Sequence, residues 1–598
     1  MLSAVTIPGT TSIAGADGGH DQRPFVKAIT GTGESVSIDP ANYSYPLGID
    51  VVQNVYETLL WYAGADAVDP VPFLAPAVPS LENGGISADG LHYTLHLRPG
   101  VRFHDGTVMD AYDVVFSIQR LLNRSDSYGM GYTIGPYLIA NYSQTKPLDQ
   151  EILDSVVEAL DQNTVRFNLV SRYAGFPAVL AQPTTSVVSK EYVLAHFAPT
   201  DQDGQGWMAT HEAGTGPYRL VEMQIENHTH LESWNRYWRE PPRISSVTIV
   251  SCASSEEAFA MLLSGEADTI DDVPEWNRSE VESDPAIHVF KENLIFSTSV
   301  CGFNLDIKPG LDIGNVPGDF FRDVNVRKAF CRAFDAERYI NSLGIDMIPL
   351  AGPIPAGMFG HDSSLRPATF NLTEAAHYLS LAINPATGNP WSQDGFVLNL
   401  SFMASSRNPW LQVILKEGLE EISARGYITG NIDVNLAAMN WPSYLEARGN
   451  QQLPLVLSGW SDSLADPHPF IFQELHSDGF IAQLNGLNDT WLDSQIEQAG
   501  IALDLSSRKA YYANVVDCDL QSAFYLFRCQ YQDYHVERAW VRGYQFNPAF
   551  QGQYFYPLYV ASDEGGSGIS IVTAAILTAL LACAAAIWTL GPRRERNR

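Results

Sequence analysis

The chain has 598 residues, more than a single hydrophobic core usually supports, so we expect two or three domains. Apolar residues make up 45% of the sequence and charged residues 17%, which is typical of a globular protein. The formal net charge of −32 would repel a phosphate backbone and argues against nucleic acid as a partner.

The beginning of the chain has one feature of a secretory signal peptide. Ala14-Gly15-Ala16 fits the small-residue pattern of a cleavage site. No basic segment precedes it, and Pro8 interrupts a weakly apolar run. We expect residues 1–16 to be the end of a signal peptide whose true start lies upstream.

The stretch HYTLHLRPGVRFHDGTVMDAYDVVFSIQRLL combines histidines, aspartates and arginines and raises the question of a catalytic site. Residues 92–97 alternate with period two and predict a strand, and residues 101–106 predict a second short strand ending in an Asp-Gly turn. Asp110 is expected to cap a helix, with Asp113 at the third helical position. His104 has no second ligand or base at suitable spacing on its own element, so we expect it to belong to the scaffold.

The following part of the chain alternates segments typical of strands with segments typical of helices. The predicted strands are residues 164–170, 243–252, 396–403 and 453–460, and the predicted helices are residues 255–265, 325–343, 373–382 and 408–426. In the second half they follow the order strand–helix–strand, which predicts an α/β domain.

The usual signatures of enzymes and cofactor sites are missing. There is no G-x-S-x-G, H-E-x-x-H, P-loop or G-x-G-x-x-G motif, and the cysteine spacings fit no zinc or haem pattern. Cys518 and Cys529 are either a disulfide of an oxidising compartment or free thiols. We therefore predict no enzymatic activity, no cofactor and no metal site.

The C-terminal segment carries the strongest signal for a membrane. Residues 568–590 contain no charge and are long enough to cross the hydrocarbon core as a helix, and a buried core helix is the disfavoured alternative. Residues 563–567 before it are a short flexible linker. The tail, residues 591–598, is rich in arginine, and positive residues stay on the cytoplasmic side. We therefore expect the rest of the chain to lie outside the cell.

Nine stretches follow one another in the order typical of a single protein family. They are SIDPANYSYPLGIDVVQNVYETLL, YTLHLRPGVRFHDGTVMDAYDVVFSIQR, GTGPYRLVE with SWNRYWR, GFNLDIKP, NVRKAFCRAFDAERYI, GPIPAGMFG, MNWPSYLEARGN, GWSDSLADPHPF and VRGYQFNP. In these stretches the chain resembles the family 5 extracellular solute-binding proteins of ABC importers, which include oligopeptide-, dipeptide- and nickel-binding proteins. The resemblance runs from about Val36 to Phe546.

The resemblance implies an α/β fold of the type II periplasmic-binding-protein class, in which two lobes joined by a hinge close over a ligand. Lobe I would comprise residues 25–300 and 538–562, with a subdomain inserted within about 60–205, and lobe II would comprise residues 301–537. The chain would cross between the lobes near residues 301–304 and 535–538.

The resemblance also implies where a ligand would be contacted. The candidate residues are Glu34, Gly302, Phe303, Asn304, Trp441, Tyr444, Trp460, Ser461 and Asp462. Core packing is the alternative for each aromatic side chain among them. Peptide-binding members carry the pattern G-W-x-x-D, whose aspartate pairs with the ligand's free α-amino group. Here Ser463 occupies that position and Asp462 lies one residue earlier, which on an extended segment turns the side chain to the other face.

The function that the resemblance implies is capture of a small solute, by default an oligopeptide or dipeptide, and its delivery to ABC permease subunits and their ATPase. We expect a monomeric receptor held at the cell membrane by its C-terminal helix, which raises its concentration near the permease. Such a span favours an archaeal source by analogy. The alternatives are a ligand-binding sensor with the same fold and a binder of a non-peptide solute, such as a sugar or a nickel chelate.

Overall fold

The computed structural model describes residues 23–31, 36–43, 45–123, 129–143, 148–196, 201, 204–404, 410–462, 464–550 and 552–561. The predicted signal peptide, linker, membrane span and basic tail lie outside these residues, as do Glu34 and Ser463. None of the helices in the described ranges is long and apolar enough to cross a membrane. Residues Arg23–Tyr559 form one of the two compact units into which the chain divides, and this unit holds the elements that follow.

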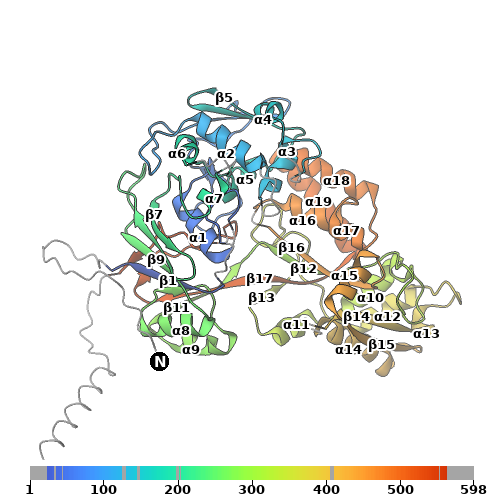
Figure 1. Ribbon diagram of the computed structural model, residues 1–598. Helices are drawn as coiled ribbons and strands as arrows, with labels where there is room; N and C mark the ends of the chain where they lie inside the picture. The colour runs from blue at the N-terminus through green and yellow to red at the C-terminus, as the bar shows by residue number, and fades with distance from the viewer. Residues whose placement is uncertain are drawn as a thin grey trace, which may run out of the picture. The chain divides into compact units, whose positions relative to one another are not determined.

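One long strand, β17 (Tyr525–Arg538), takes part in two different groups of strands. Its first half pairs with β12 (Ser297–Phe303) and β13 (Met347–Pro349). Its second half pairs with β11 (Ile287–Leu294) and β10 (Thr269–Ile270). Figure 1 shows β17 running from the one group into the other.

We use these two groups to define the lobes. In lobe I the second half of β17 is followed by β10, β1 (Phe25–Ile29), β9 (Ser246–Ser251), β8 (His228–Ser233) and β7 (Tyr218–Gln224), and in lobe II β16 (Leu455–Ser461), β12 and the first half of β17 lie side by side. Strand β1 is parallel to both β9 and β10. The backbone passes between the lobes at residues 294–297 and at Tyr531–Gln532. Both crossings precede the predicted positions by a few residues, because β12 is already paired within lobe II from Ser297 onward and Gln532 is already paired with β11 of lobe I.

Lobe I carries helices beside its sheet and a smaller sheet inserted between β1 and β7. The inserted sheet has the order β4-β6-β5. The elements of lobe I outside the main sheet are α1 (Tyr45–Val55), β2 (Leu60–Trp61), β3 (Val71–Pro72), β4 (His92–His96), α2 (Ala111–Asn123), α3 (Gly135–Leu138), α4 (Gln150–Val156), β5 (Val157–Asp161), β6 (Thr164–Asn168), α5 (Phe176–Val179), α6 (Lys190–Ala195), α7 (Gln205–Met208), α8 (Ser255–Ser264), α9 (Arg278–Ser283) and β18 (Val541–Arg542).

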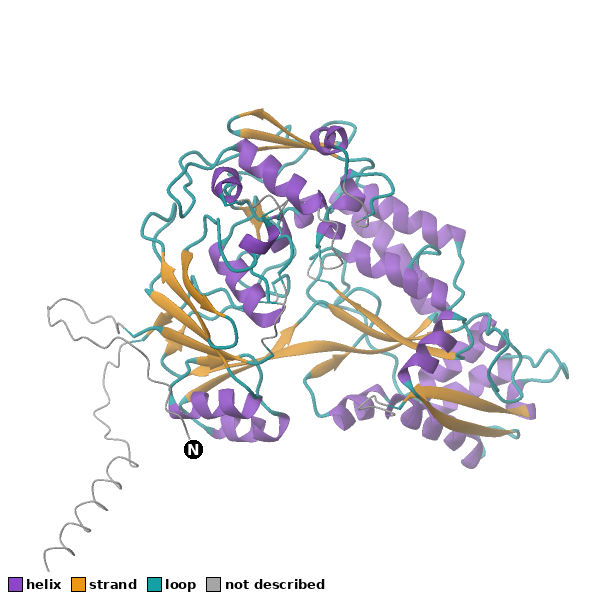
Figure 2. Cartoon of the chain, viewed as in Figure 1, coloured by secondary structure: helices purple, strands orange, loops and turns teal. Residues whose placement is uncertain are grey.

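Lobe II contains a strand–helix–strand unit, but its second strand is residues 431–439, which were not predicted, and the predicted strand over residues 453–460 pairs with β12 instead. Strands β14 (Gly395–Met403) and β15 (Asn431–Met439) pair in parallel and are joined through α14 (Trp410–Ala424), as parallel pairing requires a crossover. The remaining helices of lobe II are α10 (Val324–Ala333), α11 (Ala336–Leu343), α12 (Leu372–Leu381), α13 (Trp391–Asp394), α15 (Trp441–Gly449), α16 (Pro467–Leu475), α17 (Phe480–Leu484), α18 (Thr490–Ile501) and α19 (Leu505–Ser522). The colouring of Figure 2 shows these helices packed around the strands of lobe II.

Two predicted elements differ from the structure. The helix expected over residues 325–343 is two helices, α10 and α11, because Asp335 caps a new helix by accepting a hydrogen bond from Arg338 N at 2.9 Å. Residues 101–106 do not form a strand and contribute a single bridge, between Arg102 and Val108. The chain turns at residues 104–106 instead of pairing as a strand, and the His104 side chain is buried in lobe I.

The predicted start of α2 is confirmed in detail. Asp110 Oδ1 accepts a hydrogen bond from Tyr112 N at 2.8 Å, and Asp110 N donates to Asp113 Oδ2 at 2.9 Å. This reciprocal arrangement is a carboxylate version of the capping box. The same helix carries the buried Arg120, which pairs with Asp39 through two hydrogen bonds of 2.7 and 2.5 Å. The Asp-Pro stretch is thereby tied to α2.

The histidine that raised the question of catalysis is part of the scaffold. His104 Nδ1 lies 2.8 Å from Glu212 Oε1, and Nε2 lies 2.9 Å from the carbonyl oxygen of Gly216. Both ring nitrogens therefore have partners within lobe I. Burial lowers the pKa of His104, but Glu212, the Gly216 carbonyl and Glu57 together outweigh this effect and the net shift is upward.

Glu57 joins segments that are distant in the sequence at one buried carboxylate. It accepts hydrogen bonds from Thr215 Oγ1 at 2.8 Å, Tyr237 OH at 2.7 Å and Trp238 Nε1 at 2.9 Å. Burial raises the pKa of Glu57 to about 7, although these donors lower it. The polar residues of these segments thus hold lobe I together.

The inserted subdomain also contacts lobe II through a buried polar cluster. Asp466 Oδ1 accepts a hydrogen bond from Tyr173 OH at 3.1 Å, and Asp466 Oδ2 pairs with Arg508 Nη2 at 2.6 Å. Beside them, Ala174 N donates to the carbonyl oxygen of Gly500 at 2.8 Å. Figure 1 shows α16, α18 and α19 beside the inserted subdomain.

The two cysteines that could have formed a disulfide are free thiols. Cys518 and Cys529 are both unpaired in the structure, and Cys529 is buried.

Asp39→Ala tests the buried pair with Arg120. The substitution removes a counter-ion from a buried guanidinium, which we expect to destabilise the protein by about 3–5 kcal/mol. Urea unfolding of the purified protein measures this change. Asp272→Ala, at an exposed aspartate, is the control and should change stability little.

Glu474→Gln tests a buried carboxyl group on α16. Burial raises the pKa of Glu474 to about 8, Thr298 lowers it and Asp519 raises it. Because the folded pKa lies above the ordinary 4.5, the stability of the wild-type protein falls as the pH rises from about 4.5 to 8. We expect Glu474→Gln to raise Tm at pH 8 by about 2–4 °C or more and to flatten this fall, measured by calorimetry. An equal gain from Glu446→Gln, at an exposed site on α15, would contradict this explanation.

Candidate ligand-binding cleft

The carboxyl ends of the parallel strands β1 and β10 lie in lobe I close to the point where β17 crosses between the lobes. Thr30 follows β1 and Asp271 follows β10, and Thr30 N donates to Asp271 Oδ2 at 3.0 Å. Residues 533–535 of β17 continue from this edge, since Ile270 is paired with Val536. In open α/β sheets ligands bind outside the carboxyl ends of strands, so a ligand site is expected here.

A hollow of about 580 Å³ opens at this edge, which we call the lobe I hollow. Charged side chains around it are Lys27, Asp50, Arg239, Asp271 and Asp533, and its walls are rich in aromatic rings, among them those of Trp61, Tyr544, Phe550 and Tyr554. The volume lies in the range of small-molecule sites. Charged groups among aromatic walls suit a ligand with both polar and apolar parts.

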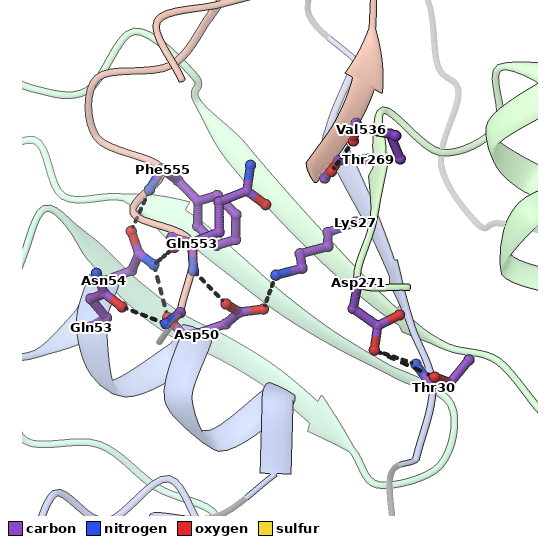
Figure 3. A network of polar contacts seen from close by, with 11 residues as sticks. Lys27, Thr30, Asp50, Gln53, Asn54, Thr269, Asp271, Val536, Gln553 and Phe555 are labelled. Carbon is purple, nitrogen blue, oxygen red and sulfur yellow. Dashed lines mark hydrogen bonds and ion pairs between the residues drawn. The ribbon is translucent and has the colours of Figure 1, made fainter. Parts of the chain in front are cut away.

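An ion pair forms the base of the lobe I hollow. Lys27 Nζ lies 2.6 Å from Asp50 Oδ2, and both side chains are almost fully buried. Asp50 Oδ1 accepts a hydrogen bond from Gln553 N at 2.8 Å, which fixes the carboxylate from α1 against the last segment of lobe I. Figure 3 shows Lys27 reaching from β1 toward Asp50, with Asp271 beside the same strand.

Several polar atoms of the lobe I hollow are buried without a hydrogen-bond partner in the described part of the chain. They include Asp271 Oδ1 and both amide atoms of Gln553. Gln553 is only 7% exposed. Burial raises the pKa of Asp271, although the Thr30 amide and Lys27 lower it. Unsatisfied buried groups cost stability, and a ligand that bonds to them recovers that cost.

A second hollow of about 410 Å³ lies on lobe II, and we call it the lobe II hollow. Its residues come from the beginning of β12, the end of β16 and the first half of β17, and include Thr298, Ser458, Trp460, Arg528 and Tyr531. Tyr531 lines this hollow and Asp533 lines the lobe I hollow. Residues two apart on a strand point to the same face, so the two hollows adjoin along β17.

Three predicted ligand contacts lie together at the end of β16. Trp460 and Ser461 line the lobe II hollow. Trp460 Nε1 donates to Asp462 Oδ2 at 3.3 Å, and Ser461 Oγ donates to the carbonyl oxygen of Phe296 at 3.3 Å. Trp460 and Ser461 remain candidates for ligand contact, whereas Asp462 is not among the residues that line this hollow.

Three other predicted contacts lie inside lobe II instead of at the cleft. Phe303 is fully buried and packs against the rings of Phe321 and Phe330. Asn304 donates to the carbonyl oxygens of Gln451 and Leu453 at 2.8 and 3.0 Å. Gly302 lies directly against the side chain of Asn485. The structure places these three residues in the core of lobe II and not at either hollow, because β12 is covered on both faces at this end.

The remaining predicted contacts lie away from both hollows or outside the described residues. Trp441 is 50% exposed at the start of α15 and stacks on Tyr444, which is buried. Neither residue lines the lobe I or the lobe II hollow. Glu34 lies outside the described residues.

The polar residues of the lobe I hollow did not emerge from the sequence. Lys27 carried a usable signal, since it stands alone in the apolar strand FVKAI. Asp271 and Gln553 carried none, because only the folded sheet brings them near each other. No group of three or more His, Cys, Asp or Glu residues suited to a metal ion occurs in the described ranges.

The family of the chain follows from its sequence. The model of the "Bacterial extracellular solute-binding proteins, family 5 Middle" matches residues 69–481, and the chain belongs to this family. It is 25% identical over 547 residues to di/tripeptide-binding protein 2 of Pseudomonas aeruginosa, covering 88% of this chain and 93% of that protein. It is 26% identical over 410 residues to the dipeptide-binding protein of Escherichia coli, covering 66% and 69%. Heme-binding protein A of Haemophilus influenzae is 24% identical, with coverage of 75% and 76%.

Solved structures share the fold. HbpA2 from Haemophilus parasuis superposes with a TM-score of 0.74 at 21% identity, covering 90% of this chain and 100% of that one. DppA from Helicobacter pylori in complex with the peptide STSA has a TM-score of 0.62 at 23% identity, covering 90% and 98%. At these identities the likeness confirms the predicted α/β fold of the type II periplasmic-binding-protein class.

Asp271→Asn tests whether the unpartnered carboxylate costs stability. The amide retains an oxygen for the Thr30 donors but removes the buried charge. Since burial raises the pKa of Asp271, the wild-type protein loses stability as the pH rises above the ordinary pKa of 3.8. We expect Asp271→Asn to raise the Tm of the ligand-free protein at pH 8 by about 2 °C. A lower Tm at pH 8 would mean that the carboxylate is satisfied within the protein.

Proposed function

We propose that the chain is the substrate-binding protein of an ABC importer, which captures a peptide between lobe I and lobe II and delivers it to permease subunits and their ATPase. The observation that carries the proposal is the pair of adjoining hollows on either side of the β17 crossing. Membership of the solute-binding family supports it.

Two backbone connections, at residues 294–297 and at Tyr531–Gln532, can act as the hinge. Rotation about a few such residues closes lobes over a ligand. A ligand that touches both hollows binds the closed form better than the open form and shifts the population toward it. The permease can then distinguish loaded from empty receptors.

A peptide is favoured over other solutes by relatives and by chemistry. Two of the relatives are named di/tripeptide-binding and dipeptide-binding proteins, and one solved structure holds the peptide STSA. The Gln553 amide offers a free donor and a free acceptor, which match the C=O and N–H of a peptide unit. Trp61 and Tyr544 in lobe I and Trp460 in lobe II offer apolar faces for the ligand's side chains.

We also propose that residues 568–590 anchor a monomeric receptor in the cell membrane, with the binding lobes outside and the basic tail in the cytoplasm, as in archaeal members of the family. Their apolar sequence and the arginines that follow support this arrangement. Anchoring holds the receptor close to its permease.

Native mass spectrometry of the purified full-length chain, before and after mild denaturation, tests the proposed ligand. We expect a released series of short peptides, because closed lobes retain their ligand during gentle purification. A single non-peptide species, such as a haem, a sugar or a metal chelate, would contradict the peptide and keep the binding function. An empty protein whose Tm no peptide raises would favour a sensor that recognises another solute.

Trp460→Ala should weaken binding of the released peptide about 10- to 100-fold, because it removes the aromatic wall of the lobe II hollow. Isothermal titration measures this loss. Trp441→Ala is the matched control, since Trp441 lies outside both hollows and should change affinity by less than about twofold. Equal losses in the two variants would place the ligand elsewhere on lobe II.

A further inference from the structure

The aspartate nearest to the family's amine-binding position is already engaged within lobe II. Asp462 Oδ1 accepts a hydrogen bond from Leu464 N at 2.8 Å, and Oδ2 accepts one from Trp460 Nε1 at 3.3 Å. Both carboxylate oxygens therefore have a donor within two residues of Asp462. The loop after β16 holds its aspartate in place instead of presenting it to a ligand.

Asp271 of lobe I differs from Asp462 in how its carboxylate oxygens are hydrogen-bonded. Its Oδ2 accepts from the amide and the hydroxyl of Thr30 at 3.0 and 3.4 Å, whereas its Oδ1 is buried without a partner in the described ranges. No Lys, Arg or His of these ranges forms an ion pair with Asp271. The carboxylate thus lines the lobe I hollow with half of its acceptor capacity unused.

The charges around the lobe I hollow leave room for one more cation. Lys27 is committed to Asp50 at 2.6 Å. The guanidinium of Arg239 lies over the ring of Tyr556 at 4.5 Å. Three carboxylates, those of Asp50, Asp271 and Asp533, line the hollow with these two cations and with His535, whose Nε2 lies 3.4 Å from Glu537 Oε2. A positively charged ligand group would balance the third carboxylate.

Gln553 provides an independent sign of a ligand in the same hollow. Its side chain is 7% exposed, and both Nε2 and Oε1 lack a partner among the described residues. Its backbone is held by Asp50 and Asn54, at 2.8 and 2.7 Å, so the residue is anchored at the hollow while its amide stays available. A buried amide with both functions free indicates a ligand that both donates and accepts.

We propose that the lobe I hollow binds the free amino group of the ligand, with Asp271 as its counter-ion, in place of the aspartate that other peptide binders carry after the G-W pair. The ammonium group donates to Asp271 Oδ1, and a peptide unit of the ligand pairs with the amide of Gln553. This assignment rests on the proposed peptide function and specifies its ligands as peptides with an unblocked amino terminus. Charge-assisted hydrogen bonds of this kind are the strongest polar contacts that such a site can make.

Titration of the purified full-length chain with tripeptides tests the assignment. The probes are a set of tripeptides with free amino termini and the same set after N-acetylation, screened by their effect on Tm and then measured by isothermal titration. We expect the wild-type protein to prefer the free form by about tenfold or more, because acetylation removes the charge. Asp271→Asn should weaken binding of the free form by a similar factor and leave the acetylated form unchanged, so that the preference disappears.

Two controls separate this result from a general loss of structure. Asp272→Asn changes the same charge at the neighbouring exposed residue and should keep the preference. Asp271→Glu keeps the charge and should keep a reduced preference. If Asp271→Asn retains the preference, or Asp462→Asn abolishes it, the amine lies at the lobe II loop and the inference is overturned. If no tripeptide of either set binds the wild-type protein, the proposed peptide function fails as well.

Discussion

The structure depends on one strand that is hydrogen-bonded in two sheets. The 14 residues of β17 give their first half to lobe II and their second half to lobe I, so neither sheet is complete without it. Irregular register occurs on both sides of the crossing, at Ser299/Val300 of β12 and at Phe290/Asn293 of β11. Such irregularities bend and twist strands, which lets the partner strands diverge while β17 continues. The cleft exists because the partners of β17 separate at this point.

Polar residues in lobe I serve two different purposes, which their hydrogen bonds distinguish. Glu57, His104 and Asp39 are buried with partners on every side, and they join distant stretches of sequence. Asp271 and Gln553 are buried with atoms left over, and they line a hollow. The first kind resists rearrangement, because removing one partner leaves a charge or donor unsatisfied. Residues of the second kind can gain hydrogen bonds from a ligand, because their unused atoms line a hollow.

Local sequence predicted those parts of the fold that depend on neighbouring residues. The alternation in residues 92–97, the cap at Asp110 and the helix predicted over residues 408–426 each follow from short-range chemistry and reappear in the structure. The division between α10 and α11 was missed because the apolar period continues across Asp335, although an aspartate before Ala-Glu-Arg is a capping signal. Gly302 and Phe303 could not be placed, because the family pattern gives their order and not which face of β12 is covered.

The ligand site was harder to predict than the fold because its residues share no local pattern. Lys27, Asp50, Asp271 and Gln553 come from β1, α1, the end of β10 and the final segment of lobe I, and only the assembled sheet brings them to one hollow. The family comparison pointed to lobe II, where the expected aspartate is displaced by one residue and bonded within its own loop. A binding protein of this kind can move its counter-ion from one lobe to the other without changing its framework, because closure brings both walls to the same ligand. The pattern of unused hydrogen-bonding atoms then locates the recognition chemistry better than the position of a motif does.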